Sequence, residues 1–300
     1  MSTRNRGTQG TLACLIIDDP LLTPQYGCLN YEKLLQEMKA HRFFTEIAFI
    51  PWNYRRSDPK TVRLFADNPN YYALCVHGCN HLANEFGEGT YEQLRALALT
   101  ALSRMEQHKR LTGLPYDPVM VFPQGHFSSI AMKALKDQGF FAAFNSTILA
   151  RDKDGLPSIE YGRPATTIYH DFPLFLRRYP KDRSHFAQDL ESGRPILIVE
   201  HHGAFRNGYK AITDLVDWIN GLGNVRWCSL REVAEHYSGG KCLLDPQVVD
   251  ASASRLRDEA PSYLRENAKV TVRRFLSEAR DNYVETSNLL DKIYWMVRGR

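Results

Sequence analysis

The stretch TLACLIIDDPLLTP (Thr11–Pro24) begins as an unbroken apolar run and ends in two adjacent aspartates, Asp18 and Asp19, and a turn without glycine. An apolar run of this length, bounded by turn residues, is typical of a strand that is buried on both faces. A doubly wound nucleotide-binding sheet would place a glycine-rich phosphate turn after its first strand. The stretch therefore favours a β/α architecture of another kind.

Short apolar runs continue to alternate with segments of helical spacing along the chain. Strands are predicted at residues 11–17, 45–51, 71–78, 118–125, 140–146, 164–170, 194–202 and 224–230. Helices are predicted at residues 31–41, 59–68, 90–113, 127–139 and 207–223. Runs buried on both faces and separated by helices indicate parallel βα units, and seven or eight such units predict a closed or nearly closed β/α barrel.

Three segments divide the chain. Residues 1–10 are predicted to be a flexible N-terminus and residues 11–240 to form the barrel. Residues 241–300 lack strand signals and carry apolar residues at helical spacing among many charges, so they are predicted to be a helical appendage.

Composition narrows the class of protein. The chain has 300 residues, of which 43% are hydrophobic and 24% charged, as expected for a globular protein. A net charge of +4 without a dense basic run argues against nucleic acid binding. The six cysteines form no C-x-x-C pair, and no apolar segment is long enough for a signal core or a membrane span, so a cytoplasmic protein without a membrane partner is predicted. The sequence leaves the oligomeric state open.

Acids and histidines gather where the predicted strands end. The first strand ends in Asp18 and Asp19, the third in His77, and a later one in His201 and His202. Because the carboxyl ends of barrel strands meet at one rim, where active sites lie, we expect these side chains to lie close together.

The spacing of His77 and His81 suits a shared ion. If residues 78–85 begin with a helical turn, residue i+4 returns over residue i, and both imidazoles can bind one cation. An aspartate from the first strand would complete a His/His/Asp set with room for water. Such a set suits zinc first, with cobalt, nickel, iron(II) or manganese as alternatives.

Two adjacent aspartates after a strand cannot point the same way. One can bind the metal while the other takes a proton from water, and a histidine can protonate the leaving group near neutral pH. The pattern therefore indicates metal-assisted hydrolysis. A serine hydrolase is disfavoured because the sequence contains no G-x-S-x-G elbow.

These motifs resemble those of the polysaccharide deacetylases, the NodB-type carbohydrate esterases of family 4. The resemblance rests on IIDDP (16–20), HGCNH (77–81), VFPQG (121–125) and LIVEHHG (197–203). It implies a distorted β/α barrel that holds a divalent metal, with the substrate an acetylated carbohydrate. It also implies that Asp18 is the catalytic base, that Asp19, His77 and His81 are the metal ligands, and that one histidine of the pair at 201–202 is the general acid. The family pattern leaves the choice within that pair open, and His201 is the one we expect to face the site.

The sequence departs from the family pattern at three positions, Pro20, Gly78 and Val121. In the family, an arginine at the position of Val121 steadies the catalytic aspartate, and Arg163 or Arg177 is expected to replace it. The resemblance also assigns to the backbone N–H of Gln124 a share in holding the oxyanion. Further residues expected near the substrate are Trp52, Pro123, Gly125 and His126.

Two functions follow from these motifs. The first is removal of acetyl groups from N-acetylated sugars or a related small amide. The second is a non-catalytic relative that binds a metal or a carbohydrate, which the substitution at Val121 favours and the retained Asp18 opposes.

Overall fold

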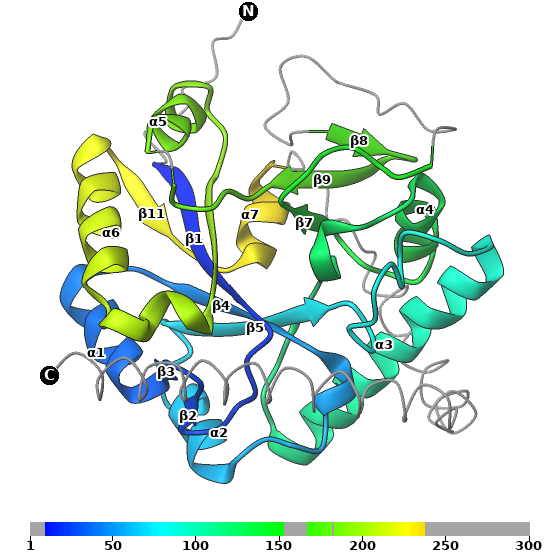
Figure 1. The fold of residues 1–300 in the computed structure, drawn as a ribbon, viewed down its shortest axis with the longest axis horizontal. Helices are drawn as coiled ribbons and strands as arrows, with labels where there is room; N and C mark the ends of the chain where they lie inside the picture. The colour runs from blue at the N-terminus through cyan, green and yellow to red at the C-terminus, as the bar shows by residue number, and fades with distance from the viewer. Residues whose placement is uncertain (1–9, 153–166, 182, 238–300) are drawn as a thin grey trace, which may run out of the picture.

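Figure 1 shows the computed structural model of the chain, which describes residues 10–152, 167–181 and 183–237. The strands are β1 (Thr11–Asp18), β2 (Gln25–Tyr26), β3 (Leu29–Asn30), β4 (Thr45–Phe49), β5 (Tyr72–His77), β6 (Asp117–Val121), β7 (Ala143–Asn145), β8 (Thr167–Tyr169), β9 (Phe172–Leu176), β10 (Ile196–His201) and β11 (Val225–Trp227). The α-helices are α1 (Tyr31–His41), α2 (Pro59–Ala66), α3 (Tyr91–Thr112), α4 (Ser129–Asp137), α5 (Ser184–Glu191), α6 (Lys210–Leu222) and α7 (Leu230–Tyr237). Three short 3-10 helices are η1 (Pro51–Asn53), η2 (Pro123–Gly125) and η3 (His202–Asn207).

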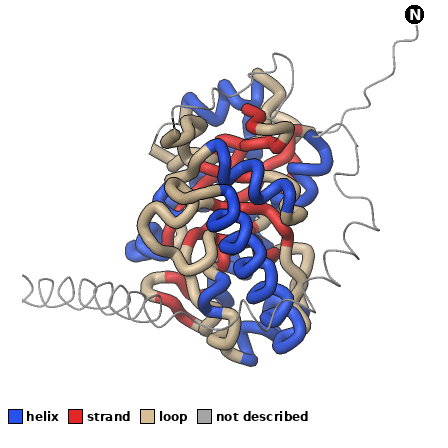
Figure 2. Tube along the Cα trace, turned by 90° about the vertical axis from the view of Figure 1, so that its right-hand side faces the viewer, coloured by secondary structure: helices blue, strands red, loops and turns tan. Residues whose placement is uncertain are grey.

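One curved sheet forms the centre of the molecule, and helices surround it (Figures 1 and 2). Its strand order is β10-β1-β4-β5-β6-β7-β9-β8, and β11 pairs with the start of β1. All of these pairings are parallel except that of β8 with β9. A single parallel bridge between Arg178 and Ile198 joins the β9 side to β10. The predicted distorted β/α barrel is thereby confirmed, with the closure reduced to one bridge.

Side chains of the strands alternate between two apolar layers. On β1, Ala13 and Leu15 pack in the cluster that includes the surrounding helices. Cys14 and Ile16 pack in a second cluster formed by strand residues and by one face of α7. The second cluster is therefore the barrel interior, closed at one end by α7. The interior-facing positions of each strand lead, at its carboxyl end, to the rim.

Local signals define the helix ends. In α3, the hydroxyl of Thr90 accepts a hydrogen bond from the Gln93 N–H, the Gln93 side chain accepts from the Thr90 N–H, and Gly113 ends the helix with φ 77°. The predicted serine cap of the helix at 127–139 is Ser128, whose side chain accepts a hydrogen bond from the Ala131 N–H. These signals are local in the sequence, which is why α3 and α4 could be predicted from it.

Several elements were missed or differ from the prediction. The strand β9, the helices α5 and α7 and the β2–β3 hairpin were not predicted, and β8 runs antiparallel rather than parallel. The helical turn predicted after His77 is wrong, because residues 78–85 form turns and irregular structure. Residues 1–9 and 241–300, predicted to be a flexible N-terminus and a helical appendage, lie outside the described residues, as does Arg163. Across the described ranges, no helix combines the length and the apolar character needed to cross a bilayer.

Two carboxylates hold the start of α7 at the closed end of the barrel. Glu46 accepts a hydrogen bond from the Leu230 N–H at 3.1 Å, and Asp117 accepts from the N–H and Nε of Arg231 at 3.1 and 3.2 Å. Complete burial, together with the nearby Asp117 carboxylate, raises the pKa of Glu46 well above its ordinary value of 4.5. The folded state therefore binds the Glu46 proton more tightly than the unfolded state does.

This raised pKa predicts a pH-dependent stability. From about pH 4.5 up to the pKa of Glu46 in the folded protein, the folded state holds more protons, so the free energy of unfolding falls as pH rises, by up to about 1.4 kcal/mol per pH unit. The Glu46→Gln variant is expected to lose this slope, as measured by urea unfolding across that range. Glu235→Gln, on the exposed face of the same helix, is the control and should keep it. An unchanged slope in Glu46→Gln would contradict the prediction.

Candidate metal centre

The rim of the barrel brings together four polar side chains from four strands. Asp18 ends β1, His77 ends β5, Arg177 follows β9 and His201 ends β10. Each continues the interior-facing alternation of its strand, since Ile16, Cys75, Phe175 and Leu197 lie in the interior cluster. The predicted convergence of strand ends is therefore present in the structure.

Asp19, His77 and His81 form a compact set of three ligand-type side chains. One ligand atom from each lies within 4.8 Å of the other two. Oδ1 of Asp19 is 3.0 Å from Nε2 of His77 and 2.9 Å from Nε2 of His81. Two imidazole nitrogens and one carboxylate oxygen are a donor set that suits zinc and related divalent ions, so these residues fit the metal expected from the sequence.

The electrostatics of the set favour a charged carboxylate. Burial alone would raise the pKa of Asp19, but hydrogen bonds from His77 and His81 outweigh burial and hold that pKa well below its ordinary value. Burial would lower the pKa of His77, and the nearby Asp18 and Asp19 carboxylates raise it instead. The Asp19 carboxylate attracts both imidazoles, which gathers the ligand atoms around one point.

A backbone carbonyl orients His77. Its Nδ1 lies 3.0 Å from the carbonyl oxygen of Val121, which also accepts a hydrogen bond from the Gly78 N–H at 3.0 Å. Because Nδ1–H donates to this carbonyl, Nε2 is the nitrogen left to face Asp19. The imidazole is thus oriented so that the nitrogen that would bind a metal, Nε2, points toward Asp19.

His81 reaches the set through an unusual backbone rather than through a helix. Its φ is +57°, in the left-handed region that histidine adopts only at a cost, and Asp19 also has a positive φ of 79°. The turn at Gly78, with φ +61°, reverses the chain after β5. Proximity of His77 and His81, predicted from a helical repeat, therefore results from two left-handed turns.

Asp18 and Arg177 form a buried ion pair beside this set. Nη1 of Arg177 lies 2.5 Å from Oδ1 of Asp18, and the two side chains are only 3% and 4% exposed. Arg177 is held in turn through its backbone N–H, which donates to the Asn145 carbonyl at 2.9 Å. Of the two arginines expected to contact Asp18, Arg177 is therefore the one that does so in the described part of the chain.

Comparisons with known proteins agree with this arrangement at the level of the fold. No family model and no curated protein matches the sequence. Among solved structures, a protein from Mycobacterium smegmatis described as a candidate polysaccharide deacetylase covers 78% of this chain and 93% of its own, with a TM-score of 0.55 and 13% identity. The chain has the NodB-type deacetylase fold.

Two further solved structures are similar at lower scores. A family 4 carbohydrate esterase from Bacillus anthracis covers 76% of this chain and 84% of its own, with a TM-score of 0.46 and 15% identity. A family 4 pseudoenzyme from the same organism covers 76% and 66%, with a TM-score of 0.45 and 10% identity.

Within the NodB-type fold, the two histidines at the end of β10 have different surroundings. Nε2 of His201 lies 3.8 Å from Oδ2 of Asp19, and its side chain is 43% exposed, next to the parallel ring of Tyr179. His202 instead packs edge-on against Tyr26 and lies over Gly27. Of the two, His201 is the one that faces the candidate metal centre.

The motif VFPQG, residues 121–125, lies at the same rim, where β6 ends and η2 begins. Pro123 lies against Gly78, since a Cβ built on that glycine would be 2.4 Å from Cγ of the proline. Gln124 is exposed and has a left-handed backbone with φ 56°, and Gly125 accepts a hydrogen bond from the Asn145 side chain. His126 lies 3.3 Å from the Arg151 guanidinium, and burial followed by that charge lowers its pKa.

Trp52, expected near the substrate, and Cys79, which lies between the two histidines in the sequence, both contact Arg104. The ring of Trp52 packs against the guanidinium of Arg104, at 5.0 Å, and is partly buried. The Cys79 thiol is buried 3.4 Å from the same arginine, and burial raises its pKa to about 12. Because the thiolate form is disfavoured, Cys79 is poorly suited to bind the metal.

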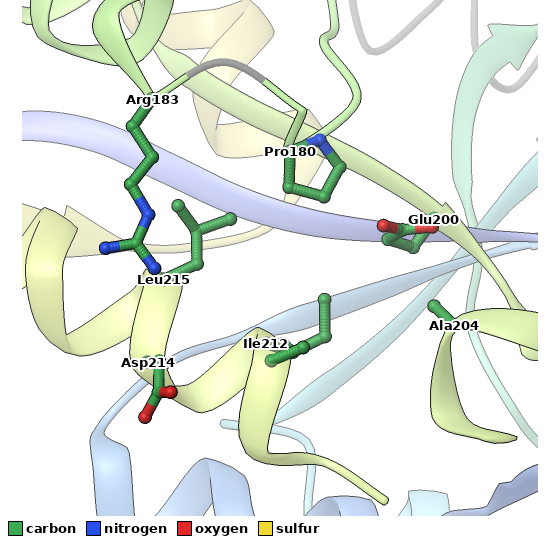
Figure 3. Close-up of a pocket in the computed structure, with 8 residues that line it drawn as sticks. Pro180, Arg183, Glu200, Ala204, Ile212, Asp214 and Leu215 are labelled. Carbon is green, nitrogen blue, oxygen red and sulfur yellow. The ribbon is translucent and has the colours of Figure 1, made fainter. Parts of the chain in front are cut away.

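A cavity of about 340 Å³ lies elsewhere, between β10, η3 and α6 (Figure 3). Glu200, Ile212 and Leu215 line it. Glu200 and His201 are consecutive on β10, so their side chains point to opposite faces of the strand. The cavity is therefore on the helix side of the sheet and not part of the candidate metal centre.

Sequence reasoning missed residues that support the site from other elements. Arg177 was named only as one of two alternatives, and the strand that positions it was not predicted. FPLFL, residues 172–176, is apolar enough to have been recognised, although its proline weakens a strand prediction. Glu85 and Arg104 contact the loop between the two histidines, but neither belongs to a sequence motif that could have identified it.

Proposed function

We propose that this protein is a metal-dependent hydrolase that removes acetyl groups from N-acetylated sugars or a related small amide. The observation that carries the proposal is the buried Asp18–Arg177 pair directly beside the His/His/Asp set. A hydrolase needs a base next to its metal, whereas a site that only binds a metal does not need one. The fold, shared with a structure described as a candidate polysaccharide deacetylase, supports the same substrate class.

Each residue has a separate role in the proposed reaction. Asp19, His77 and His81 would hold the divalent cation, with zinc proposed first. When bound, the ion supplies Lewis-acid activation and lowers the pKa of water from about 15.7 to about 7. Asp18 takes the proton of the attacking water, and Arg177 keeps its carboxylate in place.

The remaining roles complete the transfer of the acyl group. His201 would donate a proton to the departing amine, because its exposed ring borders the Asp19 carboxylate from the open side. The backbone N–H of Gln124 is proposed to hold the acyl oxygen as negative charge develops on it. Trp52 and His126 remain proposed substrate contacts, and their rings lie against Arg104 and Arg151.

The proposal predicts acetate release that depends on the cation. Purified protein is expected to contain about one divalent ion per chain by elemental analysis, and to release acetate from a panel of N-acetylated mono- and oligosaccharides. Stripping the ion with a chelator should abolish release, and adding Zn²⁺ or Co²⁺ back should restore it.

The same measurement separates the alternative function. A protein that binds the cation and the acetylated sugars, yet releases no acetate with any of the metals, would be a non-catalytic binding protein. A protein that contains no divalent ion and binds none would contradict the metal centre itself.

A further inference from the structure

The loop between the two histidines wraps around a single carboxylate, that of Glu85. Oε1 of Glu85 accepts hydrogen bonds from the N–H of Cys79 at 2.8 Å and of His81 at 3.0 Å. Oε2 accepts one from the N–H of Asn80 at 2.9 Å. Three consecutive backbone donors therefore converge on one side chain four residues beyond His81.

The backbone conformation explains the convergence. Gly78 and His81 both have left-handed φ values, +61° and +57°, and bracket the two residues between them. Such turns aim successive N–H groups at one point and create a concavity that attracts an anion. The Glu85 carboxylate fills this concavity, so the loop carries its own counter-charge.

Gly78 is matched to this arrangement. A Cβ added to Gly78 would lie 2.2 Å from Oε1 of Glu85 and 2.4 Å from Cγ of Pro123. Any side chain at position 78 would therefore displace the carboxylate or the proline. A glycine after the first histidine is therefore what leaves room for the Glu85 carboxylate.

A buried arginine holds the loop from the other side. Nη1 of Arg104, on α3, donates to Oδ1 of Asn80 at 2.7 Å and to the carbonyl of Cys79 at 3.2 Å. The N–H of Trp52 also donates to that carbonyl, at 3.1 Å. The Cys79 carbonyl is thus fixed to the barrel wall, and among the contacts described the N–H groups of residues 79–81 are bonded only by Glu85.

We propose that Glu85 is a positioning residue that holds His81 in its left-handed backbone and so aims its imidazole at the cation. This inference rests on the proposed function, because it assigns Glu85 a role toward the proposed metal. Without the carboxylate, His81 can relax from a φ of +57°, and its Nε2 moves away from Asp19, 2.9 Å distant in the structure. Outer-shell partners of this kind change metal affinity about 10- to 100-fold.

The test compares Glu85→Gln with Glu88→Gln in the full-length chain. Glutamine has nearly the same shape but keeps one acceptor oxygen and turns a donor toward the loop. Glu88 is exposed and bonds only the Asn84 side chain among the described contacts, so it is the matched control. Three quantities are measured: Co²⁺ affinity by calorimetry, the visible absorption spectrum of bound Co²⁺, and hydrogen exchange of the amides of residues 79–81.

Glu85→Gln is expected to bind Co²⁺ at least about 10-fold more weakly, to shift the Co²⁺ spectrum and to lose amide protection at residues 79–81. Glu88→Gln should match the wild type in all three. Glu85→Asp, which restores the charge with a shorter reach, is expected to recover part of the affinity.

Three results would overturn the inference, and they differ from one another. Lost amide protection with unchanged Co²⁺ affinity and spectrum would reduce Glu85 to a structural residue and leave the proposed function intact. Unfolding of both Glu85 variants would show that the whole barrel depends on this side chain, which contradicts a local positioning role. A wild type that binds no divalent ion would overturn the proposed function along with the inference.

Discussion

Asp18→Asn is expected to lower the rate of acetate release by about 10²- to 10⁴-fold, the range associated with loss of a general base. Asparagine has nearly the same shape as aspartate but cannot accept the proton of the attacking water. Since Asp19, His77 and His81 supply the proposed ligands, Zn²⁺ or Co²⁺ content should remain close to one per chain. Acetate release and metal content, measured on the same samples, check both parts.

A second buried aspartate provides the control for this variant. Asp189, on α5, is 5% exposed and accepts hydrogen bonds from Arg178 at 2.6 and 3.0 Å. It therefore forms a second buried carboxylate–arginine pair, with the arginine that follows Arg177 in the sequence. Asp189→Asn should lower stability as Asp18→Asn does, but keep the turnover of the folded protein. If the two variants lose activity equally, Asp18 serves the fold rather than the reaction.

The parts of this site that sequence could predict are those encoded locally. IIDDP and HGCNH place Asp18, Asp19 and His77 at or just after strand ends, with His81 four residues further on, and parallel strands deliver their ends to one rim. To predict a site of this kind, one needs only the alternation of side chains along each strand and the order of the elements in the chain.

The parts that could not be predicted depend on distant contacts. Asp18 and Arg177 are 159 residues apart, and their approach depends on the order β7-β9-β8, in which β9 was not recognised. Glu85 is only four residues from His81 in the sequence. Its contacts with the loop nevertheless depend on the left-handed backbone of Gly78 and His81, which a helical repeat does not predict. At the two departures from the family pattern, the structure places Glu85 against Gly78 and Arg177, rather than a residue at position 121, against Asp18.

Arg177→Met is expected to destabilise the protein by about 3–5 kcal/mol, because it leaves the Asp18 carboxylate buried without its counter-charge. Methionine keeps much of the apolar volume of the arginine stem, so the loss reports mainly the charge. Urea unfolding measures it. Arg178→Met, which removes a pair whose arginine is 21% exposed, should cost less.

Combining the two substitutions isolates the interaction. In the Arg177→Met background, Asp18→Asn removes the unpaired charge, so the double variant should be more stable than Arg177→Met alone. Activity should not recover, since the base is absent. A double variant whose destabilisation is the sum of the two single ones would mean that Asp18 and Arg177 do not depend on each other. Arg177 would then not be the residue that replaces the arginine expected at position 121.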